Sequence, residues 1–265
     1  MRPPSSEADR LTRRSLFGEV AEDYAAVRPG YPGVVADWIG ERVPLGAATR
    51  ILEIGCGAGQ ATRLLGGRGC RITALEPHPA LAAIARRGLD ALAVRIVEAA
   101  FEDFVGEPGS FDLVLAAASF HWLDPATRCR DSARLLRPGG GLAIVYSDHP
   151  APYTGFFSRV QSVYQAVAPA LLRPASAAPD GNPFLRELEE CGDFDRIETR
   201  SVDWSRDYGR DDYLRLLNTY SDHRRLDGGI RRELFEAIGR LIDADFGGHV
   251  VRPYRTMLHL ALRRD

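Results

Sequence analysis

A glycine-rich turn and two acidic residues form the clearest chemical pattern in this chain. The turn contains Gly55, Gly57 and Gly59 and follows an apolar run, in the segment I51-L-E-I-G-C-G-A-G-Q60. Glycine tolerates positive φ and carries no Cβ, so the backbone of such a turn can approach a ligand closely. Glu76 follows the next apolar run, 23 residues after Glu53, where a carboxylate can accept both ribose hydroxyls of a nucleoside. The pattern predicts a nucleoside site at the carboxyl edge of a parallel sheet.

The residues around the turn also indicate which nucleoside would bind. In the dinucleotide fingerprint G-x-G-x-x-G, the third glycine brings the helix close to the strand. Here Gln60 occupies that position, and the carboxylate of Glu53 would repel a pyrophosphate. The same carboxylate would suit a ligand with an ammonium group. S-adenosylmethionine has a ribose, an amino group and no phosphate, so it fits this turn better than a nicotinamide dinucleotide.

Several segments occur in the order found in class I S-adenosylmethionine-dependent methyltransferases, which the chain resembles. They are E53-I-G-C-G-A-G-Q60, Glu76, F101-E-D103, F111-D-L-V-L115 and R134-L-L-R-P-G-G140. Two further segments resemble the small-molecule branch that includes type 11 and trans-aconitate methyltransferase-like proteins: F17-x6-Y24-x3-R28-P-G-Y-P32 and A118-S-F-H-W122. The resemblance is strong over about residues 15–147 and weak beyond them, and it specifies the cofactor better than the substrate.

The resemblance implies a set of residues around the cofactor. The glycine turn would approach its amino acid and sugar, and Phe101 with Glu102 would lie beside adenine, although Glu102 could also belong to a plain acidic loop. Ala116 and Ala117 would line the methionine. Tyr24 would belong to an N-terminal lid, in which Arg28 would pair with the cofactor carboxylate. The expected cofactor residues are Tyr24, Arg28, Glu53, Gly55, Gly57, Gly59, Gln60, Glu76, Pro77, Phe101, Glu102, Ala116 and Ala117.

His121 and Trp122 are the expected catalytic residues, because they follow the strand end that should face the reaction pocket; packing in the core is the alternative. With an ordinary pKa of about 6.5, His121 could remove a proton from a hydroxyl or amine acceptor. A carboxylate acceptor has no proton to lose, and His121 would then only orient it. The resemblance to a branch that includes carboxyl methylation favours orientation.

The acceptor itself would contact a second group of residues. Helical periodicity predicts one helix over 210–225, on which Tyr220 and Arg224 are four residues apart and share a face. Arginine could hold a carboxylate, and tyrosine could contact an aromatic acceptor, although such a face can also be half-buried surface. The expected substrate-binding residues are Tyr31, Tyr220, His223 and Arg224.

Composition excludes several other function classes. All 34 basic residues are arginine, which excludes a lysine Schiff base and a P-loop lysine. The net charge is −2 with no basic run, so no nucleic-acid partner is expected. No apolar run approaches the ~20 residues of a membrane span, and neither the cysteines nor the histidines have metal-ligand spacing. These features predict a cytoplasmic protein with reduced thiols, no metal, and a small-molecule acceptor.

Alternating apolar runs and turn signals predict an α/β fold. The strands of the core are expected at 50–54, 71–75, 94–97, 111–116 and 142–146, with helices between them. Later segments are expected as helices at 153–171, 184–191, 210–225 and 230–245, and as strands at 195–204 and 255–262. The resemblance implies a Rossmann-like, seven-stranded, mostly parallel sheet with helices on both faces. The helices within 153–191 and 210–225 would form a cap over its carboxyl edge.

Three regions follow from this pattern. Residues 1–12 are expected to be a disordered tail, and 13–147 an S-adenosylmethionine-binding core with the lid. Residues 148–265 would supply the cap helices and the strands that complete the same sheet. Two other functions remain open: a protein that binds S-adenosylmethionine without transferring its methyl group, and a nicotinamide oxidoreductase, against which Gln60 argues.

Overall fold

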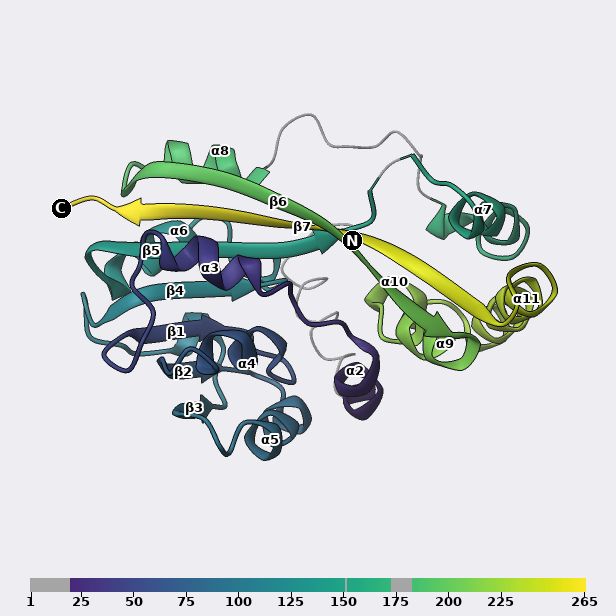
Figure 1. Cartoon of the computed structure of the whole chain (residues 1–265), viewed down its shortest axis with the longest axis horizontal. Coiled ribbons are helices and arrows are strands. Elements are labelled where there is room, and N and C mark those ends of the chain that lie inside the picture. The colour runs from purple at the N-terminus through teal and green to yellow at the C-terminus, as the bar shows by residue number, and fades with distance from the viewer. Residues whose placement is uncertain (1–19, 151, 173–182) are drawn as a thin grey trace.

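The computed structural model describes residues 20–150, 152–172 and 183–265. Its seven-stranded sheet has the order β3-β2-β1-β4-β5-β7-β6 (Figure 1). The strands are β1 (Arg50–Ile54), β2 (Arg71–Leu75), β3 (Val94–Val97), β4 (Phe111–Ala117), β5 (Leu136–Asp148), β6 (Phe194–Gly209) and β7 (His249–Arg263). Strands β1 to β5 are parallel, and β7 is antiparallel to β5 and β6. The predicted fold class is confirmed. The expected tail at 1–12, the following residues 13–19 and the segment 173–182 lie outside the described residues.

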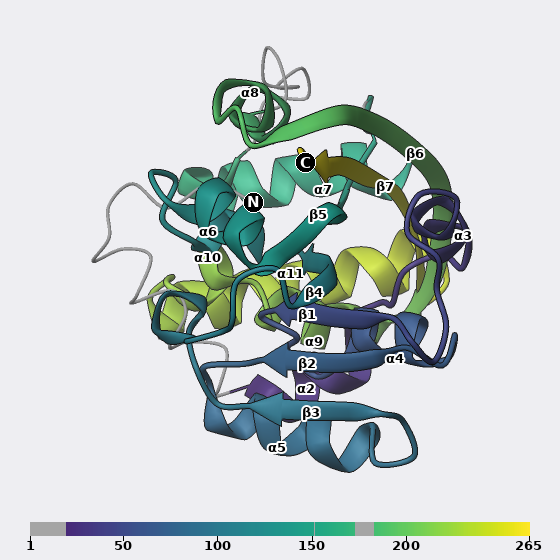
Figure 2. The same cartoon turned by 90° about the vertical axis from the view of Figure 1, so that its left-hand side faces the viewer.

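The parallel strands are apolar because helices cover both faces of the sheet. On one face, α3 (Val34–Gly40) and α4 (Gln60–Gly66) pack on the strands; on the other lie α6 (Arg128–Leu135) and α8 (Pro183–Glu190) (Figure 2). A further helix, α5 (Pro79–Gly88), follows β2. It begins at a proline, whose missing N–H costs nothing in the first helical turn.

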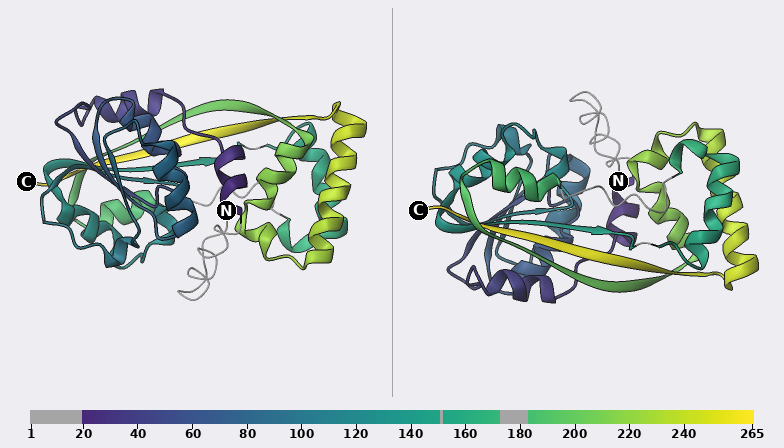
Figure 3. Two further views of the ribbon diagram at one scale, coloured as in Figure 1. Left: turned by 90° about the horizontal axis from the view of Figure 1, so that it is seen from below. Right: turned by 90° about the horizontal axis from the view of Figure 1, so that it is seen from above.

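Strands β6 and β7 are much longer than the rest and form a two-stranded ribbon beyond the core. They pair from Phe194 and Arg263 to Gly209 and His249, whereas β5 pairs with β7 only as far as Arg255. Residues 204–209 and 249–254 therefore extend past the sheet into the cap (Figure 3). The sequence prediction placed the start of the last strand six residues too late.

The cap packs on the inner face of this ribbon. It contains α7 (Phe156–Val167), α9 (Arg210–Asn218), α10 (Ser221–Arg224) and α11 (Gly228–Phe246) (Figure 1). Buried side chains from the helices and the ribbon form a common core. The helix α8 was expected in the cap, but it packs on the sheet, where Leu188 is fully buried.

The predicted helix over 210–225 is wrong, because the chain breaks between α9 and α10. The hydroxyl of Thr219 donates a hydrogen bond to the carbonyl of Leu216, which competes with helical bonding. The Arg28 side chain also donates to the Thr219 carbonyl, at 3.0 Å. Tyr220 therefore caps α10 and does not belong to the same helix as Tyr213.

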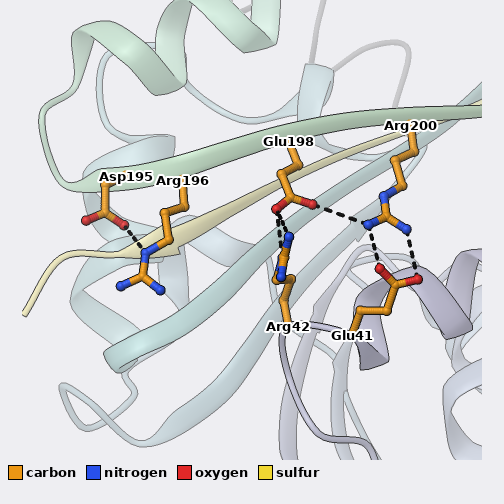
Figure 4. Close-up of polar contacts among 6 residues, drawn as sticks. All are labelled: Glu41, Arg42, Asp195, Arg196, Glu198 and Arg200. Atoms are coloured by element: carbon orange, nitrogen blue, oxygen red, sulfur yellow. Dashed lines mark hydrogen bonds and ion pairs between the residues drawn. The ribbon is translucent and has the colours of Figure 1, made fainter.

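Two N-terminal helices precede the first strand, and they make different contacts. The first, α2 (Ala21–Val27), lies between the core and the cap at the carboxyl edge of the parallel strands (Figure 3). Ion pairs join the end of α3 to β6: Arg200 donates to Glu41 at 2.9 Å, and Arg42 donates to Glu198 at 2.7 Å (Figure 4). Because these side chains are solvent-exposed, each pair adds little stability.

Candidate cofactor and acceptor site

The three glycines of the turn all have positive φ, at 66°, 58° and 88° for Gly55, Gly57 and Gly59. At two of these positions, neighbouring side chains leave no room for a Cβ atom. A Cβ on Gly55 would lie 2.9 Å from the Cβ of Ser119, and one on Gly59 would lie 2.7 Å from the Leu89 side chain. The nearest atom to a Cβ on Gly57 is in the ring of Tyr24, at 3.4 Å. Gly57 is therefore the glycine whose backbone faces the N-terminal helix.

The Glu76 carboxylate is fixed beside this turn. It is 5% exposed, and it accepts hydrogen bonds from the backbone N–H of Gly57 at 2.9 Å and of His78 at 2.8 Å. Bonds from two backbone donors hold both of its oxygens in place. The end of β2 thus carries a pre-oriented acceptor next to the turn that follows β1.

Glu53 is a buried carboxylate with an unsatisfied oxygen. It is 1% exposed, and its Oε2 has no hydrogen-bond partner among the described residues. Burial raises the pKa of Glu53 to about 7, an effect reinforced by Glu76 and opposed by the nearby Thr62. A buried carboxylate in this state would be stabilised by a cation.

We expect ionisation of Glu53 to lower the stability of the ligand-free protein as pH rises. The pKa of Glu53 is raised from 4.5 to about 7, so its contribution is fully present below pH 4.5 and is lost as pH rises through 7. Glu53→Gln should remove this loss and make the ligand-free protein more stable at pH 8, by up to about 3 kcal/mol. Urea unfolding of both proteins at several pH values measures the difference. Parallel pH profiles for wild type and variant would contradict the expectation.

The N-terminal helix places Tyr24 and Arg28 next to the turn and the cap. The Arg28 side chain donates to the Thr219 hydroxyl at 2.8 Å and to its carbonyl at 3.0 Å. Its guanidinium carbon lies 5.0 Å from the centroid of the Tyr24 ring and 4.3 Å from that of Tyr220. Arg28 thus connects the lid to the cap through neutral groups.

Residues after β4 turn sharply across the end of the sheet. Ala116 is buried and Ala117 half-buried, and Ala118 adopts a φ of 55°, which is uncommon for a residue with a side chain. The Ser119 hydroxyl then donates to the Ile54 carbonyl, which ties this turn to β1. The short 3₁₀ helix Phe120–Trp122 follows, so the strand ends β1 and β4 hold it in position.

His121 does not titrate near neutrality as the sequence suggested. Burial lowers its pKa to about 3, and its Nε2 atom is buried without a hydrogen-bond partner among the described residues. Its ring lies 4.6 Å from that of Trp122, which is buried in turn. A neutral imidazole of this kind can donate or accept a hydrogen bond, but it is a weak base.

Replacing His121 should therefore have a modest effect on turnover. We expect His121→Gln to keep kcat within about tenfold, because loss of a general base would cost about 10² to 10⁴. The pH profile of kcat should show no basic group near the ordinary histidine pKa of about 6.5. A loss of 10³ or more, with such a group in the wild-type profile, would identify His121 as the base.

The remaining expected cofactor residues surround the two strand ends. Gln60 is half-buried at the start of α4, and Pro77 is exposed just after Glu76. Phe101 is 6% exposed and packs in the core of the sheet, whereas Glu102 beside it is exposed. Their short 3₁₀ helix, Phe101–Asp103, follows β3 at the same edge.

The expected acceptor residues are divided between the core and the cap. Tyr31 packs against the core beside α3, and burial raises its pKa, an effect increased by Tyr24 and Glu53. Tyr220 lies under Arg28, as described above. His223 faces away into the cap, where its Nε2 lies 2.8 Å from the Tyr164 hydroxyl, and Arg224 is half-buried beside it.

Sequence reasoning missed the arginines of the long ribbon. Arg252 and Arg206 lie opposite each other in the pairing of β7 with β6. The alternation V-V-R-P-Y places Arg252 and Tyr254 on one face, but the proline hides the strand pattern in this segment. Arg128 was also missed, although it is almost completely buried.

Comparison with known proteins agrees with this arrangement. Residues 52–144 match the family model described as a methyltransferase domain. Over these residues the chain is similar to a methyltransferase domain, and the matched segment contains the glycine turn, Glu53 and Glu76.

Individual relatives extend the match to different degrees. An uncharacterized methyltransferase of Mycobacterium tuberculosis is 36% identical over 131 residues, 49% of this chain and 51% of that protein. The chain thus spans about half the length of the first curated relatives it matches. Malonyl-[acyl-carrier protein] O-methyltransferase of Paenibacillus is 29% identical over 261 residues, 93% of this chain and 94% of that protein.

Among solved structures, a type II methyltransferase assigned in Anaeromyxobacter dehalogenans has a TM-score of 0.59 and 25% identity, covering 89% of this chain and 96% of that one. Within the described residues, no three or more histidine, cysteine, aspartate or glutamate side chains are grouped so that they could hold a metal ion. No described helix combines the length and apolar character needed to cross a membrane.

Proposed function

We propose that the chain is an S-adenosylmethionine-dependent methyltransferase that acts on a small-molecule acceptor. The observation that carries the proposal is Glu53, whose buried and unsatisfied oxygen adjoins the glycine turn of a methyltransferase domain. A ligand ammonium would compensate this carboxylate, and Glu76 could accept the ribose hydroxyls of the same ligand. The names of two relatives, malonyl-[acyl-carrier protein] and ubiquinone biosynthesis O-methyltransferases, support methylation of small acceptors.

The chain's own residues would bind and orient the reactants. The backbone at Gly57 would lie along the ligand, with Tyr24 and Arg28 closing over it from α2. When bound, S-adenosylmethionine supplies an activated methyl group on a sulfonium. The protein then needs to hold the acceptor in line and exclude water, and positioning of this kind can supply about 7–11 kcal/mol.

Neutral side chains around the reaction site suit this chemistry. His121 and Trp122 would orient the acceptor without taking up charge, and the aromatic rings would favour the positively charged donor over bulk water. Gln60, Pro77, Phe101 and Glu102, together with Ala116 and Ala117, would complete the cofactor site. Tyr31, Tyr220, His223 and Arg224 would contribute to the acceptor side.

Calorimetry with S-adenosylmethionine, S-adenosylhomocysteine and NAD tests the cofactor assignment. We expect binding of the first two and none of NAD, since Glu53 and Gln60 oppose a pyrophosphate. Tight binding of NAD with no response to the other ligands would overturn the proposal. Formation of S-adenosylhomocysteine across a panel of acceptors then separates an enzyme from a protein that only binds the cofactor.

The lid gives a second measurable expectation. Residues 21–32 contain Tyr24 and Arg28 and lie between the core and the cap, so bound S-adenosylhomocysteine should slow their amide hydrogen exchange. Helix α8, which packs on the sheet away from α2, serves as an internal reference that should change little. Unchanged exchange throughout 21–32 would mean that α2 is a fixed surface helix.

The organisation of the chain follows from the same proposal. Residues 13–147 would bind the cofactor, and 148–265 would supply the acceptor side and complete the sheet. A cytoplasmic location is consistent with Cys56, Cys70, Cys129 and Cys191, none of which forms a disulfide.

A further inference from the structure

The inner face of the β6–β7 ribbon carries two arginines directly opposite each other. Arg206 of β6 pairs in register with Arg252 of β7, two residues from Tyr208 and Tyr254 respectively. Side chains at opposite positions of an antiparallel pair lie on the same face, with Cβ atoms about 4.5–5.5 Å apart. Like charges at such positions destabilise the pair, so this arrangement needs a compensating group.

No carboxylate among the described residues provides this compensation. Neither Arg206 nor Arg252 forms an ion pair there, and the Nε of Arg252 is buried without a hydrogen-bond partner. The outer face of the same ribbon differs. There Arg255 donates to both oxygens of Asp203, at 2.6 and 2.7 Å.

The aromatic residues around Arg252 hold it but do not neutralise it. Its guanidinium carbon lies 4.9 Å from the ring centroid of Tyr254, and that of Arg206 lies 4.8 Å from the ring centroid of Tyr208. Burial raises the pKa of both tyrosines and of Tyr213, so their hydroxyls stay protonated at neutral pH. The site therefore keeps a positive charge within a largely apolar wall.

A continuous row of side chains joins this charge to the glycine turn. Arg252 lies 5.8 Å from the Tyr220 ring centroid, and Arg28 lies 4.3 Å from the same centroid. Arg28 also lies over Tyr24, whose ring approaches Gly57. Arg252 and Arg28 therefore contact the same aromatic residue, Tyr220, at the junction of the lid and the cap.

We propose that Arg252, assisted by Arg206, binds a carboxylate on the methyl acceptor, at the end of the acceptor that faces the cap. This inference rests on the proposed function and specifies the substrate class of the same site. The planar guanidinium can donate two parallel hydrogen bonds to a carboxylate, which gives orientation as well as affinity. Arg252 would then be a specificity-determining residue, and acceptors without the negative charge would bind poorly.

Matched acids and amides test this subsite without knowledge of the natural acceptor. Three acids, 3-phenylpropionate, hexanoate and glutarate, and their amides are titrated by calorimetry into the protein saturated with S-adenosylhomocysteine. We expect at least one acid to bind and its amide not to bind. Arg252→Gln should weaken that acid about ten- to a hundredfold and leave S-adenosylhomocysteine binding unchanged.

Arg255→Gln is the matched control, because it removes an arginine of the same strand from the opposite face. It should leave the affinity for the acid unchanged. Should Arg252→Gln fail to fold, Arg206→Gln tests the same charge from the neighbouring strand, and it should also weaken the acid.

Three outcomes would overturn the proposal: equal binding of acid and amide, equal affinities in the Arg252 and Arg255 variants, or no acid binding to a wild type that binds S-adenosylhomocysteine. A wild type that fails to bind S-adenosylhomocysteine would instead refute the proposed function. The same titrations on the ligand-free protein would then decide separately whether Arg252 holds a carboxylate.

Discussion

Replacing Glu76 with alanine is expected to weaken the binding of S-adenosylhomocysteine about a hundredfold or more. A carboxylate that accepts two ribose hydroxyls forms two charge-assisted hydrogen bonds, each worth about 1.5–3 kcal/mol, and 1.4 kcal/mol is a factor of ten. The substitution also frees the N–H groups of Gly57 and His78, which Glu76 now holds at 2.9 and 2.8 Å. The turn should therefore lose its alignment as well as its ligand contacts. Calorimetry measures the dissociation constant.

Glu102→Ala is the control for this experiment, because it removes an exposed carboxylate from the same edge of the sheet. It should change the free energy of S-adenosylhomocysteine binding by less than the ~1.5 kcal/mol of one charged hydrogen bond. Glu76→Gln keeps the size of the side chain and removes its charge. Its amide oxygen can still accept a hydrogen bond from one backbone N–H, but its NH₂ group would face the other backbone N–H, which is also a donor. Equal, small effects at Glu76 and Glu102 would place the ribose elsewhere.

The second large effect concerns stability. Arg128 is 5% exposed and donates to both carboxylate oxygens of Glu187 and to the Phe120 carbonyl. Its guanidinium carbon also lies 4.6 Å from the ring centroid of Phe120 and 5.2 Å from that of Phe184. The Glu187 side chain is 27% exposed, so water can partly compensate its carboxylate, but the buried Phe120 carbonyl also loses its donor. Hydrogen bonds to charged groups are each worth about 1.5–3 kcal/mol, so we expect a total loss of about 3 kcal/mol. Arg128→Ala should lower the free energy of unfolding by this amount, measured by urea denaturation.

Arg186→Ala provides the comparison within the same region. Arg186 pairs with Glu190 one turn away on α8, and both side chains are largely exposed. Exposed helical pairs of this kind contribute about 0.3–0.5 kcal/mol, so the loss should be near that value. Similar losses for the two variants would show that the Arg128 pair is not isolated from solvent.

Much of the core could be predicted because its signals are local. The strands β1, β2 and β3 begin and end at the residues expected from the sequence. Each is a short apolar run, and Gly55 or the Pro77 and Pro79 segment marks where the chain turns. Such boundaries depend on neighbouring residues and little on the rest of the fold.

The cap and the electrostatics of the site depend on distant contacts. The break after α9 involves Arg28, 191 residues earlier in the chain, which binds the Thr219 carbonyl. The low pKa of His121 and the high pKa of Glu53 arise from burial, which spacing alone does not reveal. The position of α8 on the sheet likewise depends on the pair between Arg128 and Glu187.

The continuity of β6 and β7 has a mechanical consequence. Because both strands run without interruption from the sheet into the cap, the ribbon has no loop between the two parts at which the cap could hinge (Figure 1). The cap is thus a stiff extension of the sheet and not a hinged lobe. Helix α2 contacts the cap through Arg28, through the buried side chain of Val27 and through an exposed pair between Asp23 and Arg215. We expect this short helix to move aside when the reactants bind and leave. Both reactants would then enter and leave by the same route, so the rate of turnover would depend on how fast α2 moves away from the cap.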